Sequence, residues 1–371
     1  MDDRSWRWLA VRGRPILIVA ATYAYFLIFA QFGFLHRITE KIGSEHWNEV
    51  LGLMAMMGIG FSLWTGFRIH RDTTKGYLLV GFMGASLASL LAMRADSLPL
   101  FCLAGSLGGA SLGVLTVAVV GTLEKYCPAE GVGMVSGLGT GMAYFFCNIP
   151  HVFEGSPLAQ CGLGALVGLF GLAIVLGWRL PTGLNEEQGE SKLESSIGWG
   201  WVRYLLVFLL LIGVDSAAFT RIQDTPELLA LSWSGTGRLW MIGWTHALAA
   251  ILGGWMLDRG CQKVVYGLAF AFLAIGFLGI SRLGGGWGFV LLYASGVSLY
   301  STALVAFALK VSFAVRPTVA VALVYGVAGW IGSGLGIGMV QDLGLIPPPF
   351  WWIVALLMGL VLFVPGRKVA V

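Results

Sequence analysis

The sequence predicts an all-α polytopic membrane protein, because it is strongly apolar, poor in charge and divided into segments long enough to cross a bilayer. Of its 371 residues, 57% are hydrophobic and only 11% are charged, whereas about 25% of a typical soluble domain is charged. This composition excludes an ordinary soluble enzyme, a nucleic-acid-binding module and a disordered chain. The long apolar tracts favour helices over a β-barrel, whose strands alternate in polarity.

A membrane-spanning helix needs about 20 apolar residues. Twelve segments meet this requirement: 15–35, 47–67, 76–93, 98–122, 131–150, 157–178, 203–220, 238–257, 264–281, 286–309, 317–341 and 348–366. We expect an N-terminal six-helix bundle over 1–180 and a C-terminal six-helix bundle over 199–371. The polar, glutamate-containing stretch 181–198 is predicted to be the cytoplasmic linker between them.

The orientation follows from the basic residues, which favour the cytoplasmic side of a membrane. When the N-terminus is placed in the cytoplasm, only six of the 23 Lys and Arg residues fall on the outer side. These six are Arg37, Lys41, Arg94, Arg221, Arg238 and Arg282. We therefore expect both termini in the cytoplasm. The short connections and the absence of a recognisable targeting signal favour a bacterial inner membrane.

Two connections show an internal repeat. The sequence Gly66-Phe-Arg-Ile-His70-Arg71-Asp72-Thr-Thr-Lys75 follows the second predicted span, and Gly254-Trp-Met-Leu-Asp258-Arg259-Gly260-Cys-Gln-Lys263 follows the eighth. Gly, Arg and Lys align at an offset of 188 residues, close to half the chain. This offset is what a duplicated six-span unit would produce.

The second of these connections resembles the loop signature of the major facilitator superfamily. The first departs from it, because His70 stands where the family usually has Asp and Asp72 where Gly is usual. The resemblance implies two six-helix bundles that rock between inward-open and outward-open states around a central cavity. It also implies that the loop forms a conformational latch, made here by Gly254, Asp258, Arg259, Gly260 and Lys263.

Glycines recur every four residues in two spans that are equivalent under the repeat. They are Gly133, Gly137 and Gly141 in the fifth span, and Gly334 and Gly338 in the eleventh. Such spacing puts backbone on one face of a helix, so we expect close helix packing at these positions.

Two titratable residues lie deep in the C-terminal half. Asp215 is about 9 Å below the outer end of its span, and His246 is about 12 Å below the outer end of the next. Because these helices are consecutive and antiparallel, the two side chains are candidates for proton coupling. A buried carboxylate costs several kcal/mol unless it is protonated or paired. A packing or capping role for Asp215 therefore stays open.

The resemblance further implies that spans one, four, seven and ten line the cavity. The polar candidates for substrate contacts on these spans are Tyr23, Gln31, Ser106, Thr116, Tyr293, Ser298, Tyr300 and Ser301. No Lys or Arg lies well inside a span, and anion transporters generally need such a cation. We expect a small neutral, amphipathic or cationic substrate.

The preferred interpretation is a proton-coupled secondary transporter that is not an enzyme, needs no cofactor and acts as a monomer in the bilayer on a small molecule, without nucleic acid. One alternative is a copper importer linked to cytochrome oxidase assembly, since Met142, Cys147, His151 and Cys161 are weak candidates for soft-metal ligands. Another is a non-transporting subunit or assembly factor of a membrane complex, derived from the same superfamily.

Overall fold

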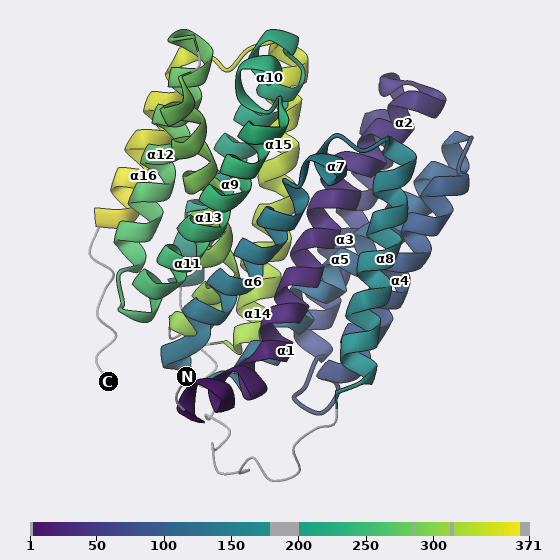
Figure 1. Ribbon diagram of the computed structural model, residues 1–371, viewed down its shortest axis with the longest axis vertical. Coiled ribbons are helices and arrows are strands. Elements are labelled where there is room, and N and C mark those ends of the chain that lie inside the picture. The colour runs from purple at the N-terminus through teal and green to yellow at the C-terminus, as the bar shows by residue number, and fades with distance from the viewer. Residues whose placement is uncertain (1–2, 179–199, 285, 312–314, 364–371) are drawn as a thin grey trace. The chain divides into compact units, whose positions relative to one another are not determined.

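The computed structural model describes residues 3–178, 200–284, 286–311 and 315–363, and these are almost entirely helical (Figure 1). Ten helical segments of this part are long and apolar enough to cross a membrane. The chain is therefore an all-α, multi-pass membrane protein.

One of the twelve predicted spans is shorter in the structure. The segment at 131–150 contains α6 (Val132–Cys147), which has 16 residues, against about 20 needed to cross the hydrocarbon core. The segment at 348–366 contains α16 (Pro348–Phe363), and the last three residues of that segment lie outside the described part of the chain. α6 ends early because Pro150 follows closely and cannot continue a helix. The predicted linker 181–198 lies outside the described residues.

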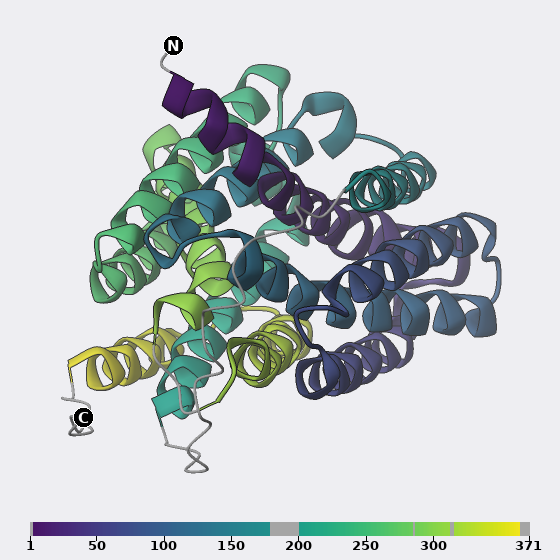
Figure 2. The same ribbon diagram turned by 90° about the horizontal axis from the view of Figure 1, so that it is seen from below.

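Contacts divide the chain into two compact units. The helices of the first unit are α1 (Asp3–Tyr25), the π-helix η1 (Phe26–Gly33), α2 (Phe34–Ile42), η2 (Ser44–His46), α3 (Trp47–Arg68), α4 (Thr74–Arg94), α5 (Leu98–Tyr126), α8 (Pro157–Leu176) and α14 (Pro317–Val321). In this unit α5 is the central helix, since it packs against α3, α4, α1 and α14. α8 packs against α4 and α1, as Figure 2 shows from below.

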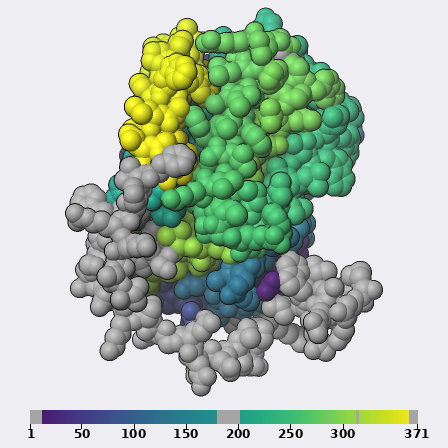
Figure 3. All heavy atoms as spheres, turned by 90° about the vertical axis from the view of Figure 1, so that its left-hand side faces the viewer, coloured from purple at the N-terminus to yellow at the C-terminus, as the bar shows by residue number. Residues whose placement is uncertain are grey.

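The second unit is organised around α13. Its helices are η3 (Ala129–Gly131), α6, α7 (Pro150–Phe153), α9 (Gly200–Gln223), α10 (Pro226–Ser232), α11 (Thr236–Asp258), α12 (Gln262–Arg282), α13 (Trp287–Lys310), α15 (Val327–Leu343) and α16. α13 packs against α6, α11 and α12, and α9 packs against α15. α12 and α16 lie side by side on one face of this unit (Figure 3). A second π-helix, η4 (Ala322–Gly326), connects α14 to α15.

The helix boundaries support the repeat. α4 and α12 have 21 residues each, and both their first and last residues differ by 188 (74 to 262 and 94 to 282). The same offset relates Val132 in α6 to Ala320 in α14. α6 comes from the first half of the sequence but belongs to the second unit, whereas α14 comes from the second half and belongs to the first unit. The fifth helix of the first repeat thus belongs to the second unit, whereas the fifth helix of the second repeat is divided, with α14 in the first unit and α15 in the second.

Close packing at glycines is confirmed in α6. A Cβ on Gly137 would lie 2.4 Å from the carbonyl oxygen of Ala250 in α11, and one on Gly133 would lie 2.2 Å from that of Gly254. In α15 the prediction for Gly334 and Gly338 is wrong, since a Cβ on either residue would meet nothing within 4 Å.

The glycines of α15 that approach α9 are Gly332 and Gly336. A Cβ on Gly336 would lie 2.5 Å from the carbonyl oxygen of Gly213. Residues two apart point about 200° apart on a helix, so Gly336 and Gly338 occupy opposite faces. The four-residue spacing was right, but it selected the wrong face of the helix.

Substitution of these two glycines by alanine should have opposite effects on stability. Gly336→Ala should lower the free energy of unfolding by about 1–3 kcal/mol, because its methyl group collides with α9. Gly338→Ala should leave it unchanged or raise it by up to about 1 kcal/mol, because alanine favours the helix. Thermal unfolding of the purified variants in detergent measures the difference. Equal destabilisation by both substitutions would contradict this packing of α15.

Candidate functional site

The buried carboxylate of Asp215 is held by two tyrosines of α13. The hydroxyl of Tyr293 donates to Oδ1 at 2.5 Å, and the hydroxyl of Tyr300 donates to Oδ2 at 2.5 Å. Tyr293 and Tyr300 are seven residues apart, about two helical turns, so both reach α9 from one face of α13. Each oxygen of the buried acid therefore has its own donor.

His246 is placed by α11 and contacts a different part of α13. Its Nδ1 forms a hydrogen bond with the hydroxyl of Ser298 at 2.8 Å. Its ring stacks on that of Tyr144 from α6, with centroids 4.5 Å apart and planes 8° apart. One face of the imidazole and its Nδ1 are thus engaged, and the side chain is buried.

α6 completes the cluster through two hydroxyl pairs. Tyr144 and Ser301 have their oxygens 2.9 Å apart, and so do Thr140 and Thr302. The ten-residue stretch 293–302 of α13 therefore bonds to α9, α11 and α6. We call Asp215, Tyr293, Tyr300, His246, Ser298, Tyr144, Ser301, Thr140 and Thr302 the α13 polar cluster.

Asp215 and His246 have no hydrogen bond or ion pair with each other. Each binds its own residues of α13, which lie on neighbouring turns. The sequence placed both residues at similar depth but could not show that α13 would carry the partners of each.

A second polar arrangement lies at the end of α11. The carboxylate of Asp258 accepts hydrogen bonds from the backbone N–H groups of Gly133 and Met134, both at 2.8 Å. It also forms an ion pair with Lys310 at 2.5 Å, and Lys310 donates to the carbonyl of Ala129. The carboxylate lies at the N-terminus of α6, where the helix dipole stabilises negative charge.

The other residues predicted for the latch lie around this carboxylate. Gly254 is part of the close α6–α11 contact, and Gly260 has φ +79°, a backbone conformation that favours glycine. The guanidinium of Arg259 lies 4.0 Å from the ring centroid of Trp255. Lys263 is exposed on α12.

The equivalent end of α3 in the first unit is built with reversed charge. Arg316, immediately before α14, donates to the carbonyl oxygens of Phe67 at 2.9 Å and Ile69 at 3.1 Å. It also lies 3.3 Å from Nδ1 of His70, which occupies the position equivalent to Asp258. A cation is favourable at the C-terminal carbonyls of a helix. Arg316 therefore finds its partners in these carbonyls, and no acid equivalent to Asp258 is needed at the end of α3.

Four of the eight predicted substrate contacts lie together. Tyr293, Ser298, Tyr300 and Ser301 are all buried in the α13 polar cluster. In the first unit, Tyr23 is buried, and Gln31 is half-buried in the π-helix η1. Ser106 is half-buried, and Thr116 donates to the carbonyl of Gly113 at 3.0 Å.

The soft-metal candidates are scattered. Met142 is 45% exposed, Cys147 is buried and His151 is exposed, while Cys161 belongs to the first unit. The described residues contain no group of three or more His, Cys, Asp or Glu side chains placed to hold a metal ion.

Sequence reasoning missed Tyr144, Thr140, Thr302 and Lys310. Tyr144 and Thr140 lie on the fifth predicted span, whereas the resemblance implies that spans one, four, seven and ten line the cavity. Their spacing of four residues puts both on one face of a helix. That signal could have marked a polar stripe on the glycine-rich fifth span.

No family model matches the chain, and no curated protein matches it.

The hydrogen bonds to Asp215 should contribute more to the free energy of unfolding than hydrogen bonds between two neutral groups. Tyr300→Phe should lower the free energy of unfolding by about 1.5–3 kcal/mol, because it removes a donor from a buried charge. In an Asp215→Asn background the same change should cost about 1 kcal/mol or less. Denaturation of the four proteins in detergent measures this double-mutant cycle. An equal cost in both backgrounds would mean that no charged interaction is lost.

Proposed function

We propose that this chain is a secondary active transporter of the major facilitator type. It would move a small neutral, amphipathic or cationic solute across a bacterial inner membrane, driven by protons. The observation that carries the proposal is the buried carboxylate of Asp215, bonded to two tyrosines between membrane helices. The helix boundaries that recur at an offset of 188 residues support the assignment to this type.

Protonation of Asp215 would change the bonding between α9 and α13. The ionised acid accepts from Tyr293 and Tyr300 at once. A protonated acid carries one O–H donor of its own, so one of the tyrosines must turn its hydrogen to another acceptor. A buried hydroxyl left without a partner costs about 1–3 kcal/mol. The proton state of one residue is thereby coupled to the relative position of two helices.

The cluster also offers contacts to a neutral or cationic solute. Serine, threonine and tyrosine hydroxyls both donate and accept, and five such groups besides the two tyrosines of Asp215 lie on α13 and α6. A cation could take the place of the two phenol donors beside Asp215. We assign to His246 the positioning of α13 through Ser298, in place of direct proton sharing with Asp215.

The contact of Asp258 with α6 is proposed as the latch. It joins the end of α11 to the start of a helix that belongs to the other sequence half. Breaking it would leave a carboxylate and Lys310 to be solvated separately. The contact would therefore set the balance between transporter states more than the stability of the fold.

Asp215→Asn should abolish accumulation of substrate driven by a pH gradient, because the amide mimics the neutral acid permanently. Exchange of substrate without a gradient should persist. The measurement is uptake into proteoliposomes with and without an imposed gradient, using a panel of neutral and cationic solutes. His246→Ala serves as the control, since it should shift the pH optimum while gradient-driven accumulation continues.

Accumulation of substrate by Asp215→Asn in response to the pH gradient would contradict a role of this residue in proton coupling. If no solute in the panel is taken up by the wild-type protein or stabilises it in detergent, the non-transporting interpretation replaces the proposal.

Asp258→Asn should slow transport by about tenfold, because charge–dipole and ion-pair contributions together amount to about 1–2 kcal/mol. Lys310→Gln should have a similar effect, since it removes the other member of the pair. Arg259→Ala should impair transport less, because its guanidinium lies over the ring of Trp255 and is not part of the contact between Asp258 and α6. Uptake rates and thermal unfolding are measured together. Wild-type uptake in Asp258→Asn would show that the contact has no role in the transport cycle.

A further inference from the structure

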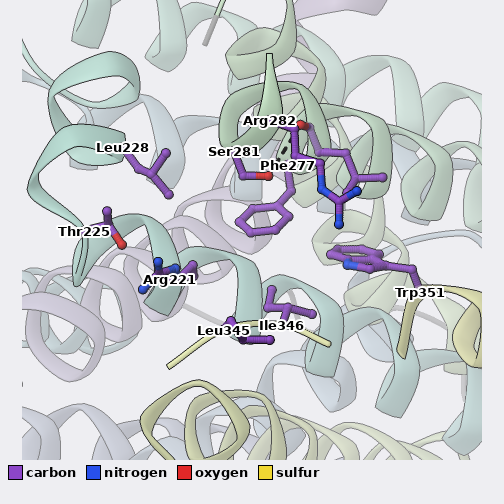
Figure 4. Close-up of a pocket in the computed structure, with 10 residues that line it drawn as sticks. Arg221, Thr225, Leu228, Phe277, Ser281, Arg282, Leu345, Ile346 and Trp351 are labelled. Atoms are coloured by element: carbon purple, nitrogen blue, oxygen red, sulfur yellow. Dashed lines mark hydrogen bonds between the residues drawn. The ribbon is translucent and has the colours of Figure 1, made fainter. Parts of the chain in front are cut away.

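A pocket of about 240 Å³ lies at one end of the second unit, at the level where several membrane helices end. It is lined by the last turns of α9 and α12, the start of α10, and the chain leading into α16. Figure 4 shows Arg282 and Trp351 on one side and Arg221, Thr225 and Leu228 on the other. By the predicted orientation this is the outer end of the spans.

Two arginines supply positive charge to this pocket. Neither Arg221 nor Arg282 has an ion pair with a carboxylate in the described part of the chain. The hydroxyl of Thr225, which also lines the pocket, is buried without a hydrogen-bond partner. Guanidinium groups bind phosphate oxygens in bidentate fashion. The polar groups of the pocket are therefore donors with capacity for an anion.

The remaining walls are apolar and aromatic. The rings of Phe277 and Trp351 stack with centroids 5.6 Å apart, and Leu345 and Ile346 lie below them (Figure 4). Beside the pocket on α16, Trp352 is 78% exposed and Ile353 is 56% exposed. Tryptophan at a helix end is typical of the level of the lipid headgroups. A ligand that carries an anion joined to a long apolar part matches both surfaces.

We propose that this pocket binds the phosphodiester headgroup of an anionic phospholipid of the phosphatidylglycerol type, with its acyl chains along α16. Arg221 and Arg282 hold the phosphate oxygens, and Thr225 donates a further hydrogen bond. Trp351 and Phe277 pack against the glycerol region. The proposal is independent of the proposed transport, since the residues that line the pocket are not those of the α13 polar cluster.

Asp224 is the group that competes with the lipid for Arg221. It lies just beyond the membrane span. Burial raises the pKa of its carboxyl above the ordinary value, while the neighbouring Arg221 lowers it. Its charge opposes an incoming phosphate, so removal of that charge should strengthen binding.

The experiment titrates the purified full-length protein in detergent with phosphatidylglycerol and follows bound lipid by native mass spectrometry. Arg221→Gln and Arg282→Gln should each weaken binding by about tenfold, the loss expected for a bond to a charged group. Asp224→Asn should bind more tightly. Arg238→Gln is the matched control, because it removes the same charge from a residue already bonded to Ala230 O and placed over Trp287.

Three results would overturn the proposal. An equal loss in Arg238→Gln would mean diffuse surface charge, and equal binding of uncharged diacylglycerol would mean an apolar groove alone. Displacement of the lipid by millimolar inorganic phosphate, with no preference for the lipid, would indicate a site for a free anion. These last two tests use the wild-type protein, so they decide the matter even if a variant fails to fold. Arg221→Lys, which keeps the charge, should retain part of the affinity.

Discussion

A buried carboxyl group organises the interior of the second unit. Asp215 lies inside a membrane-spanning helix, and its two oxygens find their donors within the protein. Both donors come from α13, and the same helix then supplies Ser298, Ser301 and Thr302 to its neighbours. The position of α13 is thereby specified by hydrogen bonds to three helices, whereas apolar packing alone would allow it to slide. In a membrane, where helices gain little from hydrophobic burial against one another, such bonds matter for specificity.

The ends of the duplicated helices solve one problem in two ways. Helix termini leave backbone groups unpaired, and those groups need partners of the right charge. At the end of α11 an acid, Asp258, reaches the N–H groups that begin α6. At the equivalent end of α3 a cation, Arg316, reaches back from the start of α14 to the final carbonyls. The first unit thus has His70 at the position equivalent to Asp258. This difference goes together with a reversal of the charge that binds the helix end.

Much of the fold was predictable from composition and periodicity. Long apolar runs located ten of the spans, and the matching loops around His70 and Asp258 indicated the repeat. Length criteria failed at α6, because Pro150 cuts the helix short. The site was predictable only in part. Depth identified Asp215 and His246 as unusual, but the direction of each side chain depends on helix rotation. Tyr144 lies on a span whose glycines suggested packing alone. In α15, two pairs of glycines have the same four-residue spacing, Gly332 with Gly336 and Gly334 with Gly338. The spacing therefore could not show which pair faces α9.

The π-helix η1 has a consequence for how this chain is compared with others. A wider turn accommodates an extra residue without breaking the rod, and each added residue rotates everything beyond it by about 100°. The buried residues of α2, which follows η1 directly, are Phe34, Arg37 and Ile38. Homologous chains can differ here by a single residue while both ends of the span stay in place. An alignment that forbids gaps within membrane helices would then misassign every position between η1 and the following loop.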